Sequence, residues 1–226
     1  MVFHVKRTAD ATPVDPAART AALVASFAER HRITLPPEVL SRAARLWELA
    51  IHLSAAARIG LTNYTNPDQL LQRLLLPTIA VFRWLDPTSP LSIAELGCGA
   101  GPLGLTLAVL VPDWTVFLVD RRDRAVAFVD VVRLKLGISN AVAIQADAAR
   151  PIDQRPVDAA LFRAVASPEE DLNIARAWLK PRGLAVIWTA HSEGPPTTDL
   201  WQPLQPISID NPPLLVLAYR LLSQAE

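Results

Sequence analysis

A glycine-rich segment between two apolar runs restricts most strongly how this chain can fold. Residues 91–96 are mostly apolar and have the length of a buried strand, and Gly97, Gly99 and Gly101 follow at alternate positions. Pro102 then opens an apolar segment long enough for a helix, and proline suits a first helical position because its missing N–H would be unpaired there anyway. Strand, glycine turn and helix in this order are typical of nucleotide-binding α/β proteins, since glycine lets a ligand approach the main chain closely.

The spacing of the glycines and a later carboxylate indicate which kind of nucleotide binds. The dinucleotide fingerprint Gly-x-Gly-x-x-Gly would need its third glycine at Pro102, whereas this chain has Gly-x-Gly-x-Gly with Glu95 two residues ahead. A second apolar run, 115–119, ends in Asp120, which lies 23 residues after Gly97. A carboxylate about 20 residues after the turn accepts ribose hydroxyl groups. We therefore predict an adenosine site made by the turn and Asp120, with a glycine turn that binds no ligand as the alternative.

The composition argues against several kinds of function. Lys plus Arg total 22 and Asp plus Glu total 22, so the net charge of zero gives no global argument for nucleic acid, while a local basic face stays compatible with it. Cys98 is the single cysteine, which rules out an intrachain disulfide and a cysteine zinc site, and the four histidines lack metal-ligand spacing, so we expect no metal. No apolar run reaches the ~18 residues of a membrane span. With no apolar signal core either, we expect a cytoplasmic protein without membrane contact.

Three parts of the chain differ in pattern. Residues 1–18 contain two prolines and few apolar residues and predict a mobile tail, whereas residues 19–86 carry apolar residues at helical spacing and predict an N-terminal helical layer. Within this layer we expect a helix to start at Asn66 and to kink or break at Pro77. Residues 91–226 alternate between strand and helix patterns, which predicts an α/β domain with a mostly parallel sheet and helices on both faces. The strands are expected at 92–97, 115–120, 141–146, 157–162, 183–189 and 214–219, with a possible short strand at 207–209 and helices at 102–111, 123–136 and 168–179.

Three segments taken together indicate a protein family more specifically than the glycine turn alone. The first, 95–104, has the turn and a further glycine after proline and leucine; the second joins 118–120 to a helix at 124–128; the third, 162–167, reads Phe-Arg-Ala-Val-Ala-Ser. Together they resemble the glucose-inhibited division protein B family, the RsmG-type guanine-N7 methyltransferases of small-subunit ribosomal RNA. The resemblance covers roughly residues 40–190. It implies a Rossmann-like class I methyltransferase fold, S-adenosyl-L-methionine as cofactor and ribosomal RNA as partner.

The resemblance also implies the roles of individual residues. Residues expected to bind the cofactor are Glu95, Gly97, Gly99, Gly101, Pro102, Asp120, Asp147, Ala148, Ala149 and Arg163. Of these, Arg163 is also the catalytic candidate, with an exposed loop arginine as the alternative. Glu95 is expected to lie near the methionine ammonium, with a helix cap or turn carboxylate as the alternative. Asp147 is expected to lie near adenine, with a solvated loop acid as the alternative. Because guanine N7 already carries a lone pair, no general base is required, and catalysis consists mostly of alignment and exclusion of water.

Departures from the family pattern leave a second hypothesis open. Polar family residues are replaced by Gly60, Leu74, Pro77, Ala125 and Thr189. These losses are compatible with a diverged member that keeps the cofactor-binding fold but has lost or changed its RNA substrate; a methyltransferase of small molecules is a third reading. Around Asp120, the cluster of Arg121, Arg122 and Arg124 either contacts RNA phosphates or is a solvated helix start. A basic rim made by Arg58, Arg73, Arg124 and Arg163 would favour RNA.

Overall fold

The computed structural model describes residues 15–150, 156–190, 199–210 and 213–222, and the predicted tail up to residue 14 lies outside them. Eight strands of the described chain form one sheet in the order β3-β2-β1-β4-β5-β8-β6, with β7 also paired to β8. The strands are β1 (Ser92–Leu96), β2 (Thr115–Asp120), β3 (Ala141–Gln145), β4 (Val157–Arg163), β5 (Leu179–Thr189), β6 (Trp201–Pro203), β7 (Ile207–Asp210) and β8 (Pro213–Leu221). Strands β1 to β5 pair in parallel, and β8 runs antiparallel to β5, β6 and β7.

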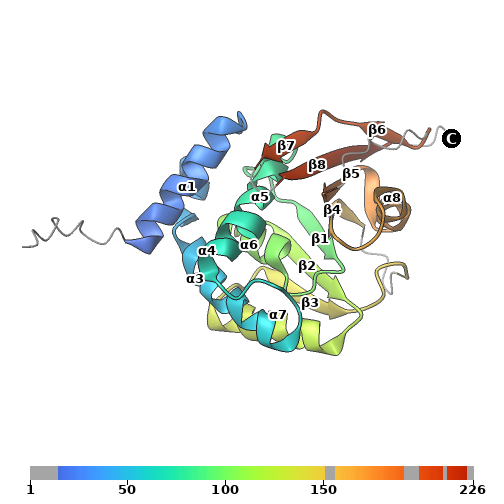
Figure 1. Cartoon of the computed structure of the whole chain (residues 1–226). Coiled ribbons are helices and arrows are strands. Elements are labelled where there is room, and N and C mark those ends of the chain that lie inside the picture. Colours follow the sequence, from blue (N-terminus) through green and yellow to red (C-terminus); the bar gives the residue numbers. More distant parts are fainter. Residues whose placement is uncertain (1–14, 151–155, 191–198, 211–212, 223–226) are drawn as a thin grey trace, which may run out of the picture.

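Helices cover both faces of this sheet, as the alternating pattern predicts (Figure 1). The helices that follow β1, β2 and β4 are α6 (Pro102–Leu110), α7 (Asp123–Lys135) and α8 (Pro168–Arg176). Side chains of α6 and α7 belong to one hydrophobic cluster together with the N-terminal helices, whereas α8 packs into a second cluster on the opposite face. All nine residues of α6 are buried, because this helix lies between the sheet and the N-terminal layer.

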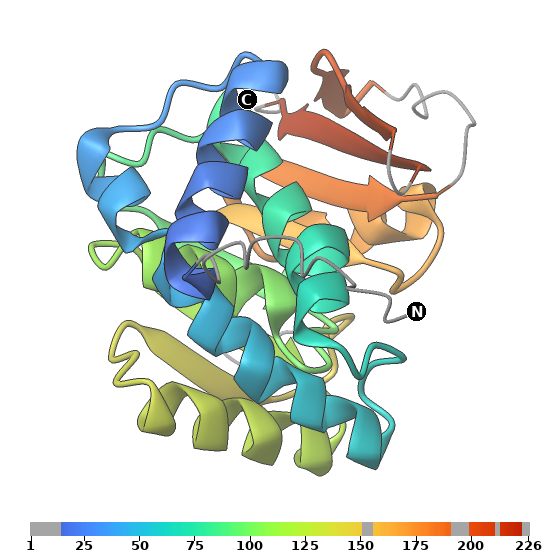
Figure 2. The same cartoon turned by 60° about the vertical axis from the view of Figure 1, so that its left-hand side comes forward.

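The N-terminal layer consists of helices on the α6 side of the sheet, several of which contact α6 (Figure 2). They are α1 (Pro16–Arg30), α2 (Pro37–Arg42), α3 (Arg45–Ser54), the 3-10 helix η1 (Ala55–Ile59), α4 (Pro67–Leu70), the π-helix η2 (Leu71–Leu75), α5 (Leu76–Thr78) and the 3-10 helix η3 (Ile79–Arg83). Asp15 caps α1, so residues 16–18, expected to belong to the tail, are helical. Asn66 caps α4 as predicted, its Oδ1 accepting the Asp68 N–H at 2.8 Å.

The structure departs from the expected elements at further places. At Pro77 the chain neither breaks nor restarts: a π-helical segment precedes the proline and helical backbone continues through it to Arg83. Strand β5 begins at Leu179 rather than 183, with Arg182 at φ 64° and a register irregularity opposite β4. The short strand β6 was not expected; the short strand at 207–209 and the last strand are confirmed.

Candidate active site

A cleft of ≈ 450 Å³ opens at the carboxyl ends of β1, β2, β3 and β4. Its lining comes from the segments that follow these strands and from α8: Gly97, Asp120, Arg121, Arg122, Ala146, Asp147, Ala148, Ala149, Ala164, Val165, Ala166 and Ile174. The chain order of the sheet reverses between β1 and β4, and open α/β sheets bind ligands at such a switch point. The volume lies within the range of small-molecule sites.

The glycine turn shapes this cleft through close backbone approaches. Gly97 has φ 69°, and a Cβ added there would lie 2.8 Å from the Val165 side chain, so the loop after β4 can approach only because residue 97 is glycine. Gly101, at φ 73°, leaves 2.5 Å between such a Cβ and the Leu118 side chain. Pro102, predicted to bind the cofactor, is the buried first residue of α6. Like Gly99 and Gly101, it does not belong to the cleft lining that the structure describes.

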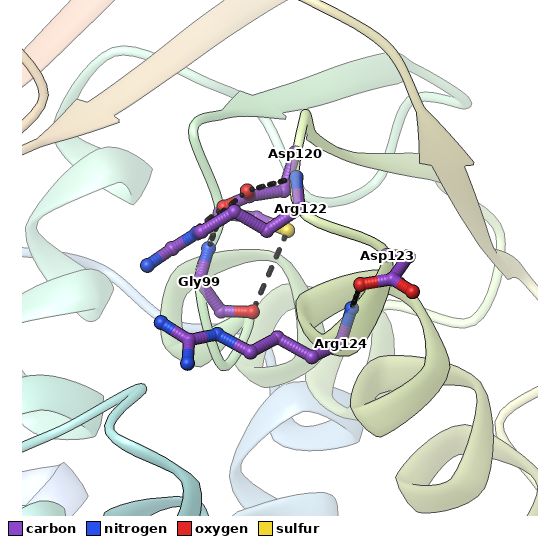
Figure 3. A network of polar contacts seen from close by, with 6 residues as sticks. Gly99, Asp120, Arg122, Asp123 and Arg124 are labelled. Carbon is purple, nitrogen blue, oxygen red and sulfur yellow. Dashed lines mark hydrogen bonds and ion pairs between the residues drawn. The ribbon is translucent and has the colours of Figure 1, made fainter.

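Asp120, the predicted ribose acceptor, lines the cleft but already has four hydrogen-bond donors (Figure 3). Oδ2 accepts the Gly99 N–H at 2.8 Å and Arg122 Nη2 at 3.0 Å, and Oδ1 accepts the Arg122 backbone N–H and Nε, each at 3.0 Å. Burial raises the pKa of this carboxyl, but the hydrogen bonds and charge of Arg122 and the Gly99 N–H outweigh burial and hold the pKa below its usual value. The carboxylate is therefore ionised and paired.

Glu95 caps a helix, which is the alternative that the sequence left open. Its Oε1 accepts the Leu103 N–H at 3.3 Å and Oε2 accepts the Gly104 N–H at 2.7 Å, at the N-terminus of α6. The residue is 3% exposed, and burial raises the pKa of its carboxyl to about 8 against the opposing effects of these N–H groups and of Arg163. Among the described residues that line the cleft, Glu95 does not appear, so the structure gives no support to the expected contact with a methionine ammonium.

Arg163, the catalytic candidate, points into the helical layer at the end of β4. Its Nη2 donates to the Arg73 carbonyl at 2.8 Å, and within the described chain its buried Nη1 has no hydrogen-bond partner. Pro77 explains why the Arg73 carbonyl is available, because proline has no N–H to donate to the carbonyl four residues earlier. Burial lowers the pKa of the guanidinium, while Tyr64 and Glu95 act in the opposite direction. The exposed loop arginine is thereby excluded, but the cleft lining does not include Arg163.

The segment after β3 lies in the cleft as predicted. Asp147, Ala148 and Ala149 all belong to its lining. Asp147 is exposed, and its Oδ1 accepts the Ala149 N–H at 3.0 Å, while the Ala148 carbonyl accepts Trp178 Nε1 at 2.7 Å. These bonds fix the backbone of the segment and leave its exposed surface toward the cleft.

The comparisons with known proteins agree with this geometry. A family model described as rRNA small subunit methyltransferase G (GidB) matches residues 47–194, more than half of the chain. Two relatives are named Ribosomal RNA small subunit methyltransferase G: one from Trichormus variabilis is 31% identical over 170 residues, or 71% of this chain and 68% of that protein, and one from Gloeobacter violaceus is 30% identical over 148 residues, or 64% and 59%. The chain belongs to this family.

Solved structures show the fold. TrmN from Thermus thermophilus superposes with a TM-score of 0.56 at 19% identity, over 77% of this chain and 53% of that one. A methyltransferase from Aquifex aeolicus, described as SAM dependent, superposes with a TM-score of 0.54 at 14% identity, over 75% of this chain and 98% of that one. The predicted class I methyltransferase fold is thus confirmed. The part of the chain that the structure describes contains no cluster of metal-ligating side chains and no helix long and apolar enough to cross a membrane.

Sequence reasoning missed several residues at the cleft. Val165 and Ala166 line it, and so does Ala164, a non-glycine residue at φ 53°. Asp171, 1% exposed, accepts the Ala166 N–H; burial raises the pKa of this carboxyl to about 7. A signal for this region was present, since Ser167 and Glu170 form the capping box that starts α8.

The positions at which the chain departs from the family pattern lie mostly in packed regions. Leu74, Pro77 and Ala125 are buried, Thr189 is 8% exposed at the end of β5, and Gly60 ends η1 at φ 66°. None of the four arginines expected to make a basic rim belongs to the described cleft lining: Arg58 and Arg124 are exposed, Arg73 is half-buried, and Arg163 is directed inward. Arg121 and Arg122, not counted in that rim, line the cleft itself.

Proposed function

We propose that the chain binds S-adenosyl-L-methionine in the cleft and methylates small-subunit ribosomal RNA, with guanine N7 as the acceptor atom. The observation that carries the proposal is the cleft at the switch point of the sheet, lined by Gly97 of the glycine turn and by Asp120 in a chain of the methyltransferase G family. The names of its relatives support the RNA target.

The described residues fit this cofactor. Gly97 presents bare backbone to the cleft, Asp120 supplies an ionised carboxylate for ribose hydroxyls, and the segment at 147–149 offers backbone and a carboxylate to adenine. When bound, the cofactor supplies a methyl group on a sulfonium. For a guanine N7 acceptor the chain itself needs to align the base and exclude water rather than move a proton. Arg163 then acts through position, because it fixes the end of β4 against the helical layer.

Arginines at the cleft supply the electrostatic side of the proposal. Arg121, Arg122 and Arg124 follow β2, and no carboxylate of the described chain forms an ion pair with Arg121 or Arg124. Arginine contacts to phosphates position a protein on RNA without reading its sequence. Arg121 and Arg124 therefore suit the RNA backbone beside the target base.

Calorimetry with S-adenosylmethionine tests the cofactor site. Wild-type protein is expected to bind, and Asp120→Ala is expected to lose roughly tenfold or more in affinity, since a hydrogen bond to a charged group contributes about 1.5–3 kcal/mol. Asp123→Ala is the matched control, because Asp123 is an exposed carboxylate three residues away that is not in the cleft lining described here. Absence of heat with wild type and every variant would contradict the proposal.

Methyl transfer tests the substrate. Purified protein is expected to transfer labelled methyl to small-subunit particles or their RNA, and digestion of the product should yield 7-methylguanosine. Cofactor binding without transfer to any form of the small subunit would instead favour the diverged member with a lost or changed substrate.

A further inference from the structure

While the Arg122 side chain is paired with it, the Asp120 carboxylate has no hydrogen-bonding capacity left for a ribose. An ionised carboxylate has about four lone-pair sites, and all four donors to Asp120 are within hydrogen-bond distance. Two are backbone N–H groups, of Gly99 and Arg122, whose positions are fixed by the turns. The other two, Nε and Nη2, come from the Arg122 side chain, which is 41% exposed.

The Arg122 guanidinium also lies where a ligand would approach. Arg122 and Asp120 both line the cleft, and Nη2 is 3.6 Å from the position that a Cβ on Gly99 would take. Figure 3 shows the Arg122 side chain running beside the Asp120 carboxylate and past the Gly99 N–H. The guanidinium therefore lies beside both the glycine turn and the carboxylate at the end of β2.

We propose that Arg122 is an internal competitor of the cofactor ribose: its guanidinium binds Asp120 in the free protein and leaves when the ribose binds. The inference rests on the proposed cofactor site and adds a residue that sets its affinity. The number of hydrogen bonds to Asp120 stays the same, because two side-chain donors leave and two ribose hydroxyls replace them. The new hydrogen bonds are weaker, because the leaving donors are charged and bidentate and the arriving hydroxyls are neutral. The bond to Asp120 thus weakens cofactor binding.

Arg121 provides a matched control for this competition. It lines the same cleft next to Arg122 and carries the same charge, but no hydrogen bond or ion pair with Asp120 is found for it among the described residues. Replacing either arginine by alanine removes one cation and similar bulk from the cleft. Only Arg122→Ala frees the carboxylate.

Calorimetric titration of the full chain with S-adenosylmethionine, adenosine and methionine tests the proposal. Arg122→Ala is expected to bind the first two about fivefold more tightly than wild type, the upper end for a partly exposed ion pair. Arg121→Ala should resemble wild type with all ligands, and methionine, which has no ribose, should show no gain with either variant. Arg122→Lys should bind S-adenosylmethionine and adenosine with an affinity between those of wild type and Arg122→Ala, since lysine keeps the charge without the bidentate geometry.

The outcomes separate this inference from the proposed function. Equal or weaker adenosine binding by Arg122→Ala, with wild type binding normally, would overturn the competition and leave the cofactor site standing. Adenosine binding by Arg122→Ala but not by wild type would strongly support the competition. Absence of binding by wild type and every variant would overturn both the competition and the proposed cofactor site. A second readout needs no activity: the Arg122 Nε–H resonance in nitrogen-15 spectra should be protected in the free protein and lose protection on addition of adenosine. Retained protection in the saturated protein would also overturn the competition.

Discussion

At the scale of single residues, Gly101 shows how strongly the turn depends on glycine. Its φ of 73° disfavours other residues, and a Cβ there would lie 2.5 Å from Leu118 Cδ2, 3.2 Å from Val129 Cγ2 and 3.3 Å from Leu105 Cδ1. We expect Gly101→Ala to lower the free energy of unfolding by about 2–4 kcal/mol, the combined cost of backbone strain and overpacking. Urea denaturation followed by circular dichroism measures this loss.

Gly137 offers a control in which only the backbone term acts. It has a similar φ of 63°, yet nothing lies within 4 Å of an added Cβ. Gly137→Ala should therefore cost about 1 kcal/mol, the typical penalty for a left-handed non-glycine residue. Equal losses in the two variants would show that the space around Gly101 does not matter.

The residues of the turn were predictable, but their contacts were not. Alternate glycines after an apolar run identify a turn, because glycine alone accepts its backbone angles readily. Which side chains press on each glycine depends on residues far along the chain, such as Val165 against Gly97. In the same way, Asp120 could be placed at the end of β2, whereas its pairing with Arg122 depends on a rotamer that no sequence pattern specifies.

At the scale of elements, Glu95 links strand β1 to helix α6 and makes their stability depend on pH. Its pKa is about 8 in the folded chain against an ordinary value of 4.5, so between these values the folded state holds a proton that the unfolded state releases. The stabilisation is complete below pH 4.5 and is lost as the pH rises through 8. Asp171, with a pKa raised to about 7, acts in the same direction at lower pH.

From pH 7 to 8 the pH dependence therefore comes mostly from Glu95, because Asp171 is already half ionised at pH 7. Wild-type protein is expected to lose about 1 kcal/mol of unfolding free energy more than Glu95→Gln over this interval, because the amide cannot release a proton. Urea titrations at pH 7.0, 7.5 and 8.0 measure both slopes. Asp171→Asn is the control, since it should change the slope mainly below pH 7 and by only roughly a third as much as Glu95→Gln above it. Parallel slopes for wild type and Glu95→Gln would contradict an uncharged Glu95.

Element boundaries were predictable wherever local chemistry sets them. Proline at a first helical position marks α6 and α8, and an asparagine cap marks α4, so these starts agree with the sequence. The passage through Pro77 was not predictable, because it depends on tertiary partners: the Arg73 carbonyl binds Arg163, and the Pro77 carbonyl accepts Trp188 Nε1 at 3.0 Å. Strand β6 was missed since its three residues are too few for a periodic pattern.

At the scale of the whole molecule, the N-terminal layer and the sheet share one hydrophobic core. The larger cluster of buried residues contains residues of the helices α1, α3 and α6. It also contains residues of the strands β1, β2, β4, β5 and β8. Polar bonds add to it: Arg45 Nη2 donates to the Leu136 carbonyl at 2.8 Å, and Arg163 Nη2 to the Arg73 carbonyl at 2.8 Å. The division of the chain at residues 86–91, suggested by sequence patterns, thus does not coincide with a gap in packing.

This shared core predicts that the layer and the sheet unfold together. Leu46 in α3 is fully buried in the larger cluster, so Leu46→Ala should lower the unfolding free energy by about 2–5 kcal/mol. If unfolding is cooperative, hydrogen exchange measured by mass spectrometry should accelerate equally in peptides from α3 and from the distant strand β2. Ile51→Ala in the same helix removes a side chain that is 46% exposed and should change exchange little in either. Hydrogen exchange that accelerates only in the N-terminal helices would show that the layer is an independent unit. The hydrogen bond from Arg163 to the Arg73 carbonyl would then join two separately folded parts rather than lie within one core.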